Sequence, residues 1–543
     1  MVAALLATLA LLALPAHAGA EPAPGAGAKR KGFRLFARAT GALTINRVSC
    51  GLASSGNICT DSTGSAVSGG GFWPKGTADQ YVFNSGLQLA GIIGNDGGPW
   101  AGDTAGGFLF DPKGTTVHGE EVRPIFNAAN SVDLGTWPAA GCVPRGDDEA
   151  RLFHPLLQSD STTGPDGAGT GVAYCRRSAS QGDIWFLSWE GNSSVRVGRQ
   201  QPLGIAVETR GMGWNFPSGN EDILYFIYTF YNVTCTNRAD YNGIRAPLAD
   251  ILYQKALDFH AGAASLGANL PAGGYTINPL FAGFGADMDV STAGANYSSV
   301  NLPFALGYVY DRSFEGAQGW TFDPSIFSAP FFPGSGFVGV KYLSSPTGAG
   351  EIQLFSNTIN GRPFAGAVND PRDVVQLYRY LSGTLSVNLG DDPCNTGNPA
   401  QTHICFVNNT SPQDMRFFQS STPLSLAPGQ GGSIVVAYIF AAPVASGGCS
   451  GSCDVKPGNP LRLVNATQLA QGANLVDSLA GFAGYRDNGD GVVTQDEFRV
   501  VPGSLLGKAK VAQGVFDAKF LLPFAPENPD FFLIPGDNQV TVI

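Results

Sequence analysis

The sequence predicts a mainly β protein organised as a large antiparallel β-sandwich. Charged residues make up only 14% of the 543-residue chain, well below the quarter or so of average globular domains, which favours many short strands over long solvated helices. The 73 glycines and 36 prolines make turns frequent. The stretch from Asp183 to Thr234 concentrates aromatic and branched residues in alternating runs, the pattern of strands that pack in a core.

This stretch is predicted to form a three-stranded meander at the centre of the sandwich. Its first and third runs, at 184–189 and 223–230, carry apolar residues at successive positions, so both faces of these strands are expected to be buried. In the second run Ile205 and Val207 face one side, whereas Glu208 and Arg210 face the other. That alternation predicts a half-exposed strand with a polar outer face.

Composition divides the remainder of the chain into regions. An apolar N-terminal run is followed by an Ala/Gly/Pro-rich stretch, strand-like runs occupy most of the length, and the composition shifts towards Ala, Leu and Gln near the C-terminus. The predicted regions are a signal peptide (1–18), a low-complexity linker (19–40), a large β-sandwich domain (41–383), an Ig-like β region that is either a second domain or the far edge of the first (384–456), a helical segment with an EF-hand-like loop (457–525), and a Pro-rich linker with two short strands (526–543).

Helices are expected at only four places. The clearest is 371–381, where Asp370 is a suitable N-cap, Pro371 occupies the first helical position and the apolar residues form one stripe. The others are predicted at 248–261, 466–482 and 504–520.

The N-terminus and the net charge restrict where the protein acts and what it binds. The apolar run Ala3–Leu14 is too short to span a bilayer, and Ala16-His17-Ala18 is a small-x-small cleavage site, so the sequence predicts a secreted or cell-surface protein. No later run is long and apolar enough for a transmembrane helix. The formal charge of −11 argues against a nucleic-acid partner, because phosphate binding requires a basic face. The expected partner is an extracellular ligand or a cell-surface component.

The nine cysteines are expected to be mostly paired in an exported protein. Short spacings favour three disulfides that each close a small loop: Cys50–Cys59, Cys394–Cys405 and Cys449–Cys453. Cys142 with Cys175 is a looser pairing, and it leaves Cys235 unpaired.

The segment 486–497 resembles an EF-hand calcium loop at most positions. Asn488 and Asp490 would supply side-chain oxygens, Val492 its carbonyl, and Glu497 a bidentate carboxylate. The first position is Arg486, which offers no oxygen and repels a cation, unless the loop slips by one residue to use Asp487. The alternative is an Asp/Asn/Gly-rich turn that binds no ion.

A second acidic pair ends a predicted strand. Asp287 and Asp289 alternate along it, so their side chains point to the same face and could hold a cation or act as an acid/base pair. Asp311 ends another strand nearby in sequence, and Glu208 is an equally ambiguous carboxylate. The alternative is that the three aspartates are ordinary polar strand ends and that Glu208 is an ordinary surface charge.

No nucleophile motif accompanies these carboxylates. The chain has neither a G-x-S-x-G elbow nor an H-E-x-x-H zinc helix. Its only G-x-G-x-x-G, at 334–339, runs into a predicted strand and not into a helix, which argues against a dinucleotide loop. Trp73, Trp100 and Trp137 lie in predicted loops, where core or loop packing is favoured over sugar stacking.

Four blocks resemble a group of uncharacterised secreted bacterial β-sandwich proteins that carry C-terminal fibronectin type III or sorting domains. The blocks are GGFWPKGTADQYVFNSGLQLAGII, PLGIAVETRGMGWNFPSGNEDILYFIYTFYNVT, GFGADMDV and DMRFFQSSTPLSLAPGQGGSIVVAYIFA. The C-terminal PENPDFFLIPGDNQVTVI is similar to the start of a fibronectin type III domain, which implies a truncated domain over 526–543. The resemblance implies export and β architecture but no catalytic residues.

These observations lead to one functional expectation and one alternative. The first is a non-catalytic structural, adhesive or binding protein at the cell surface or outside the cell, stabilised by calcium. The alternative is a secreted hydrolase of glycan or peptide that uses Asp287, Asp289 or Glu208.

Overall fold

The fold is known from a computed structural model. It describes residues 40–54, 56–60, 70–92, 180–191, 203–244, 246–265, 269–314, 328–347, 374–384, 412–447, 449, 453–455, 469 and 474–522, together with the backbone of short strands at 108–110, 120–121, 126–127, 142–143, 157–160, 173–176, 354–359, 404–405, 533–536 and 539–542. The chain divides into two compact units, 1–34 and 35–543, and all described residues belong to the second.

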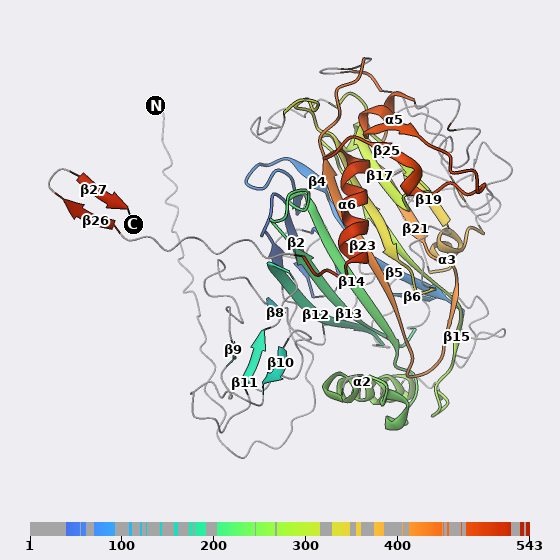
Figure 1. The fold of residues 1–543 in the computed structure, drawn as a ribbon. Coiled ribbons are helices and arrows are strands. Elements are labelled where there is room, and N and C mark those ends of the chain that lie inside the picture. The colour runs from blue at the N-terminus through green and yellow to red at the C-terminus, as the bar shows by residue number, and fades with distance from the viewer. Residues whose placement is uncertain are drawn as a thin grey trace, which may run out of the picture. The chain divides into compact units, whose positions relative to one another are not determined.

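Two large, mostly antiparallel sheets dominate the described part of the chain, as the sequence predicts (Figure 1). The larger sheet has the order β16 (Asn296–Asn301), β17 (Leu306–Asp311), β18 (Phe337–Ser344), β23 (Gly431–Ala441), β14 (Ile223–Asn232), β13 (Ile205–Gly213), β12 (Gly182–Glu190) and β7 (Glu120–Glu121), with β8 (Phe126–Asn127) also paired to β12. The second sheet has the order β20 (Ile404–Cys405), β19 (Leu354–Ile359), β21 (Met415–Ser420), β15 (Ile277–Asp287), β5 (Asn84–Gly91) and β6 (Phe108–Phe110), with β22 (Leu424–Leu426) beside β15.

The smaller elements complete the described fold. A four-stranded sheet joins β1 (Thr40–Leu43), β2 (Ser49–Ala53), β3 (Gly71–Phe72) and β4 (Gln80–Val82), and a three-stranded one joins β10 (Leu157–Asp160), β11 (Ala173–Arg176) and β9 (Cys142–Val143). Two hairpins are β24 (Phe482–Tyr485) with β25 (Phe498–Val500) and β26 (Leu533–Gly536) with β27 (Gln539–Val542). The helices are α2 (Ala246–Ser265), α3 (Val374–Ser382), α5 (Leu475–Leu479) and α6 (Leu505–Asp517), with 3-10 turns η1 (Arg238–Tyr241), η2 (Ala293–Ala295) and η6 (Gln495–Glu497).

The predicted meander is the β12–β13–β14 part of the larger sheet. The three strands pair antiparallel in sequence order, from Gly182 opposite Gly213 to Ile205 opposite Asn232. The described side chains of β12 are buried on both faces, and so are those in the first half of β14. Ile227 and Tyr231 further along β14 are half-buried, as are Glu208 and Arg210 of β13. The burial pattern therefore confirms the predictions for β12 and β13 and corrects that for β14, whose outer face is half-exposed beyond Phe226.

The two large sheets pack face to face through aromatic side chains. Phe284 of β15 lies 5.2 Å from Tyr228 of β14 and 6.3 Å from both Tyr342 and Tyr438, between ring centroids. The Tyr342 hydroxyl crosses between the sheets to donate to the Gln419 carbonyl oxygen at 2.6 Å. Large rings suit this interface because each buries much apolar surface while a tyrosine hydroxyl can still reach a polar partner.

Helices cover the outer faces of both sheets. On the second of the two large sheets, α3 packs through Tyr380, whose ring is stacked on Phe418 at 5.4 Å between centroids, and through Tyr378, which contacts Phe281. On the larger sheet α6 lies across β18 and β23 (Figure 1), and Phe520 beyond its end stacks on Trp214 at 6.0 Å. Where a helix covers the outer face of a sheet, the strands beneath it are apolar at successive positions.

Three predicted helices are present, and the fourth requires a correction. α2, α3 and α6 match the predictions at 248–261, 371–381 and 504–520, and Ser504 caps α6 by accepting a hydrogen bond from the Gly507 amide. The helix predicted at 466–482 is wrong at its C-terminal end, because α5 stops at Leu479 and strand β24 starts at Phe482. Gly481 has φ +101°, a conformation that ends a helix readily.

Region 384–456 contributes strands to both large sheets. Its strand β23 lies between β14 and β18, near the middle of the larger sheet, and its strand β21 lies between β19 and β15. β23 pairs with β14 over nine residues, from Ile223 opposite Ile439 to Tyr231 opposite Gly431. The described strands of this region are therefore hydrogen-bonded to those of region 41–383.

Two of the predicted disulfides lie in the described residues, and both are formed. Cys50–Cys59 links β2 to the loop that follows it, and Cys449–Cys453 closes a five-residue loop. Cys235 is a buried free thiol beside the Tyr241 hydroxyl. Cys394 and the Cys405 side chain lie outside the described residues, while Cys142 and Cys175 are backbone partners in β9 and β11.

Candidate functional site

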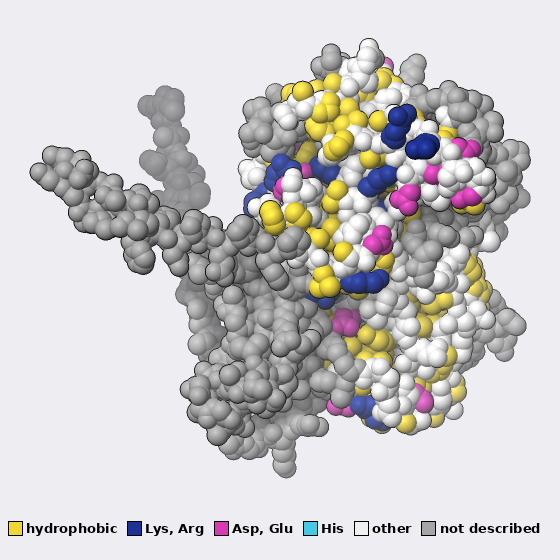
Figure 2. All heavy atoms as spheres, viewed as in Figure 1, with side chains coloured by type: hydrophobic (Ala, Val, Ile, Leu, Met, Phe, Trp, Pro, Cys, Tyr) yellow, Lys and Arg dark blue, Asp and Glu magenta, His cyan; other side chains and the backbone are white. Residues whose placement is uncertain are grey.

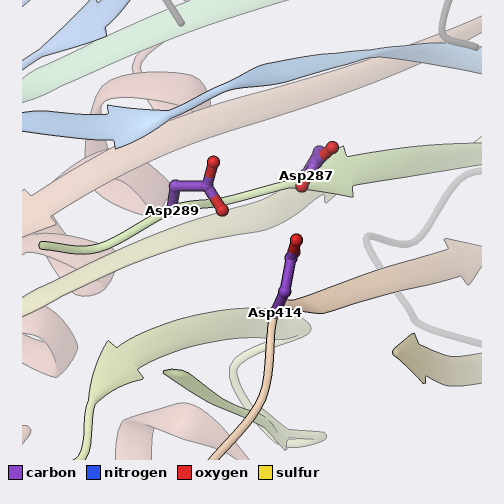
Figure 3. Close-up of side chains that lie close together, drawn as sticks. All are labelled: Asp287, Asp289 and Asp414. Carbon is purple, nitrogen blue, oxygen red and sulfur yellow. The ribbon is translucent and has the colours of Figure 1, made fainter. Parts of the chain in front are cut away.

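The strongest candidate site in the described residues is a cluster of three carboxylates: Asp287, Asp289 and Asp414 (Figure 3). One oxygen of each carboxylate can be chosen so that all three oxygens lie within 4.8 Å of one another. Two oxygens that bind the same calcium ion at about 2.4 Å can be at most about 4.8 Å apart. The spacing is therefore that of oxygens able to share one divalent cation.

The antiparallel register of β15 and β21 builds this cluster. Asp287, the last residue of β15, lies opposite Arg416 of β21. Asp289 follows Asp287 by two residues and Asp414 precedes Arg416 by two, so both lie just beyond the same end of this antiparallel pair. The three acidic side chains thus meet at one end of the β15–β21 pair, although Asp414 is more than 120 residues away in the chain.

A basic and an amide side chain complete the surroundings of the cluster. The Arg416 guanidinium donates to Asp287 Oδ2 at 2.9 Å, with the two side chains 11% and 4% exposed. The Gln80 amide approaches Asp289 Oδ2 at 3.4 Å from strand β4. Three carboxylates and one guanidinium sum to a formal charge of −2, which a bound divalent cation would neutralise. Asp287 is buried, whereas Asp289 and Asp414 are half-buried.

Sequence reasoning identified two members of this cluster and missed the third. Asp287 and Asp289 share a face, as their alternation predicts, and the structure brings them together. Asp414 precedes a strand in one of the sequence blocks quoted above, but no local pattern specifies that this strand pairs with β15. Asp311 is not in the cluster, because its Oδ1 caps a turn by accepting from the Ser313 amide at 2.9 Å.

The EF-hand-like loop at 486–497 connects two strands and not two helices. It begins after β24 and ends in η6 and β25, so the helices predicted before and after it, α5 and α6, lie beyond the hairpin and do not adjoin the loop. Gly491 has φ +80°, the turn that the EF-hand pattern requires at this position. Asn488 Oδ1 and Asp490 Oδ1 each accept a backbone amide two residues further on, from Asp490 and Val492 respectively.

Glu497 closes this loop through hydrogen bonds. Its Oε1 accepts from the Asn488 amide at 2.9 Å, and its Oε2 accepts from the Thr494 amide at 2.8 Å. These backbone hydrogen bonds, that from Thr494 first, lower the pKa of the Glu497 carboxyl. Both oxygens predicted to bind calcium thus also accept backbone hydrogen bonds that hold the hairpin together.

The other carboxylates considered from sequence are engaged in contacts within the fold. Glu208 accepts from the Trp185 indole at 2.7 Å and from the Tyr231 hydroxyl at 3.2 Å. The Arg210 guanidinium pairs with buried Asp183 at 3.1 Å. These contacts tie β12, β13 and β14 together across the outer face of the meander, so they account for the polar residues there.

A buried ionic network around Asp222 was not expected from the sequence. Asp222 directly precedes β14 and accepts from Lys508 of α6 at 2.7 Å, from the Arg47 guanidinium and from the Trp73 indole at 2.7 Å. Burial alone would raise the pKa of Asp222, but the positive charges of Lys508 and Arg47 outweigh it and the pKa is lowered. Trp73 is only 2% exposed, which confirms its packing role, and Trp100 and Trp137 lie outside the described residues.

The charge pattern of the outer surface and the length of the helices relate to the partners predicted from the sequence. On the face shown in Figure 2, Lys and Arg side chains lie in small groups among acidic and hydrophobic ones. Among the helices of the described residues, none combines the length and the apolar character needed to cross a bilayer.

A scan against protein-family models and a search of curated proteins each found no match to this chain.

Proposed function

We propose that this chain is a secreted or cell-surface β-sandwich protein with a structural, adhesive or binding role, stabilised by calcium at Asp287, Asp289 and Asp414. The observation that carries the proposal is the convergence of three carboxylates within 4.8 Å at the end of the β15–β21 pair. Calcium is the favoured ion because it takes several oxygen ligands in flexible geometry, whereas zinc prefers nitrogen and sulfur.

A calcium ion at this position would join parts of the fold that are distant in sequence. Asp287 and Asp289 end β15, and Asp414 leads into β21. Binding an ion only in the folded state stabilises that state by mass action, by about 2.7 kcal/mol when the free ion is at about 100 times its Kd. Such a site suits an extracellular structural protein, because calcium is abundant outside cells.

Thermal unfolding with and without calcium tests this site. We expect the Tm of the full chain to be about 3 °C higher in calcium at about 1 mM than in excess EDTA. A gain of about 2–3 kcal/mol in the free energy of unfolding produces a shift of this size in a large domain. Asp414→Asn should abolish this shift. Asp414 is the best residue to change because Asp287 also pairs with Arg416, so its loss would disturb the fold directly.

Two control variants identify which site is responsible. Glu497→Gln should retain the calcium shift if the carboxylate cluster binds the ion, and should lose it if the 486–497 loop does. Asp250→Asn, in an exposed ion pair with Arg238, should retain it in either case. A Tm that does not respond to calcium in the wild type would contradict the proposal.

An activity assay separates this proposal from the hydrolase alternative. We expect no turnover of a panel of polysaccharides, peptides and proteins by the wild-type chain, because the carboxylates in question have roles in the fold: Asp287 pairs with Arg416 and Glu208 binds Trp185 and Tyr231. Turnover that Asp289→Asn or Glu208→Gln abolishes, with the Tm unchanged, would contradict a non-catalytic role.

A further inference from the structure

Residues 474–522, here called the C-terminal cover, form a substructure with its own hydrogen bonds. β24 pairs with β25, and the Val501 and Leu506 amides donate to the Gly481 and Ala480 carbonyls at 2.9 and 3.1 Å. Asn474 caps α5 in a capping box with Asp477. These bonds connect α5, the hairpin and α6 to one another, so the cover can keep its internal structure while its contacts to the sheet break.

The cover packs on the outer face of the larger sheet mainly through apolar side chains. Phe520 contacts Trp214 and Tyr225, and Phe498 lies 5.1 Å from Phe304 between ring centroids. Residues from α5, the hairpin and α6 share one buried cluster with the outer face of the sheet. A face of this kind is held by water exclusion, which by itself gives little dependence on pH.

Two buried lysines cross the interface in opposite directions. Lys508 extends from the cover into the sheet, where its ammonium donates to Asp222 Oδ2 and to the Phe440 carbonyl, each at 2.7 Å. Lys341 extends from β18 of the sheet to the cover, where it donates to Gln495 Oε1 at 3.2 Å, and also to the Phe304 carbonyl at 2.6 Å. Both lysines are less than 10% exposed, at 6% and 2%. Opening of the cover would bring both ammonium groups into water.

We propose that the C-terminal cover is a pH-dependent latch that opens from the larger sheet as a unit, and that uptake of a proton by Lys341 favours the open state. Burial lowers the pKa of Lys508 as well, but the charge of its anionic partner Asp222 raises that pKa and offsets part of the effect. The atoms that contact Lys341 are a carbonyl and an amide oxygen, which are neutral. The closed state therefore disfavours charge on Lys341 more than on Lys508.

The charged groups around Lys341 do not remove this penalty. Burial lowers the pKa of Lys341 to about 7, although Asp517 of α6 and Asp496 of η6 raise it by their charge. In the register of the sheet its neighbours are Leu306 of β17 and Ala437 of β23, which do not titrate. In water the lysine regains a pKa near 10.5. Opening thus binds a proton between about pH 7 and pH 10.5, and falling pH over this range favours opening.

Hydrogen exchange of the full chain, followed by mass spectrometry, tests the latch. Opening constants of the α6 and β24–β25 amides should rise about 30-fold from about pH 8.5 to about pH 6, the ratio given by pKa values of about 7 closed and 10.5 open. Amides of β14 report global unfolding and should exchange far more slowly. Lys341→Met should remove most of the pH dependence of the cover and leave the smaller part that comes from Lys508, and the exposed-residue control Lys519→Met should keep all of it.

A second variant keeps the test decisive if methionine disturbs the packing. Lys341→Gln retains a donor for the Phe304 carbonyl but cannot titrate, and it should show the same loss of pH dependence. A pH response as large as that of the wild type in both Lys341 variants would overturn the proposal. Cover amides that exchange only as slowly as those of β14 at every pH would overturn it as well, because the cover would then open only in global unfolding.

Discussion

Asp222→Asn is expected to lower the free energy of unfolding by about 3–5 kcal/mol, the scale measured when one partner of a buried ion pair is removed. The wild-type carboxylate is 1% exposed and balances the charges of Lys508 and Arg47. Asparagine keeps the shape but removes the negative charge, which leaves a buried ammonium with no anion among its hydrogen-bond partners. Urea unfolding at constant m value measures the effect.

The matched control is an ion pair at the surface. Asp250→Asn removes the carboxylate that pairs with Arg238, where the side chains are 58% and 34% exposed. Solvent screens this pair, so the change should be within about 1 kcal/mol. A loss below about 1 kcal/mol for Asp222→Asn as well would contradict the assignment of the network as a major stabilising element.

The loss of stability caused by Asp222→Asn should also depend on the presence of Lys508 and on pH. In a double-mutant cycle with Lys508→Met, the two losses should be far from additive because both act on the same contact. The lowered pKa of Asp222 means that the stabilisation is present above the carboxyl's unfolded pKa and is lost as the pH falls through the folded value. The difference between wild type and Asp222→Asn should therefore shrink in strong acid.

Lys341→Met is expected to flatten the pH dependence of global stability between about pH 7 and pH 9. The folded pKa of Lys341 is about 7 and its usual value is 10.5, so over this window the unfolded chain binds a proton that the folded chain does not. Stability of the wild type should therefore rise with pH, with a contribution of at most about 1.4 kcal/mol per pH unit from this residue. The variant should lack that slope and should exceed the wild type most at and below about pH 7.

This measurement is a comparison of two proteins at each pH, which removes the contributions of other groups. Buried tyrosines such as Tyr342 have raised pKa values, so they oppose stability where unfolded tyrosine ionises, near pH 10 and above. Lys519→Met serves as the control, because the Lys519 side chain is exposed and its loss should leave the slope unchanged. Equal slopes for the wild type and Lys341→Met would contradict the prediction.

Local patterns predicted much of the scaffold. The alternation of 184–189, 205–210 and 223–230 identified three strands and the exposure of the first two, because side chains on a strand point to opposite faces. For the third, one face is half-exposed from Ile227 onwards, where burial on both faces was expected. Helix α6 follows from its periodicity and its Ser504 cap. The misassigned end of the helix at 466–482 has a local cause as well, since the helical composition continues past Gly481 into residues that pair as β24.

Such local patterns do not predict contacts between residues that are distant in the chain. Asp414 joins Asp287 and Asp289 only because β21 pairs with β15, and a charged residue before a strand carries no information about which strand will be its neighbour. Lys508 and Asp222 are 286 residues apart. Lys508 lies in an otherwise plausible amphipathic helix, where a lysine is expected to face water.

By itself the sequence determined the mainly β class, the central meander and the strand-end position of Asp287 and Asp289, because these depend on periodicities of a few residues. The tertiary structure alone decided which carboxylates share a site and which lysines are buried. It also showed that β23, far along the chain, lies next to β14 in the larger sheet. The physical reason is that strand order and helix docking are set by the burial of whole apolar faces, an energy that is summed over the fold and that no single segment encodes.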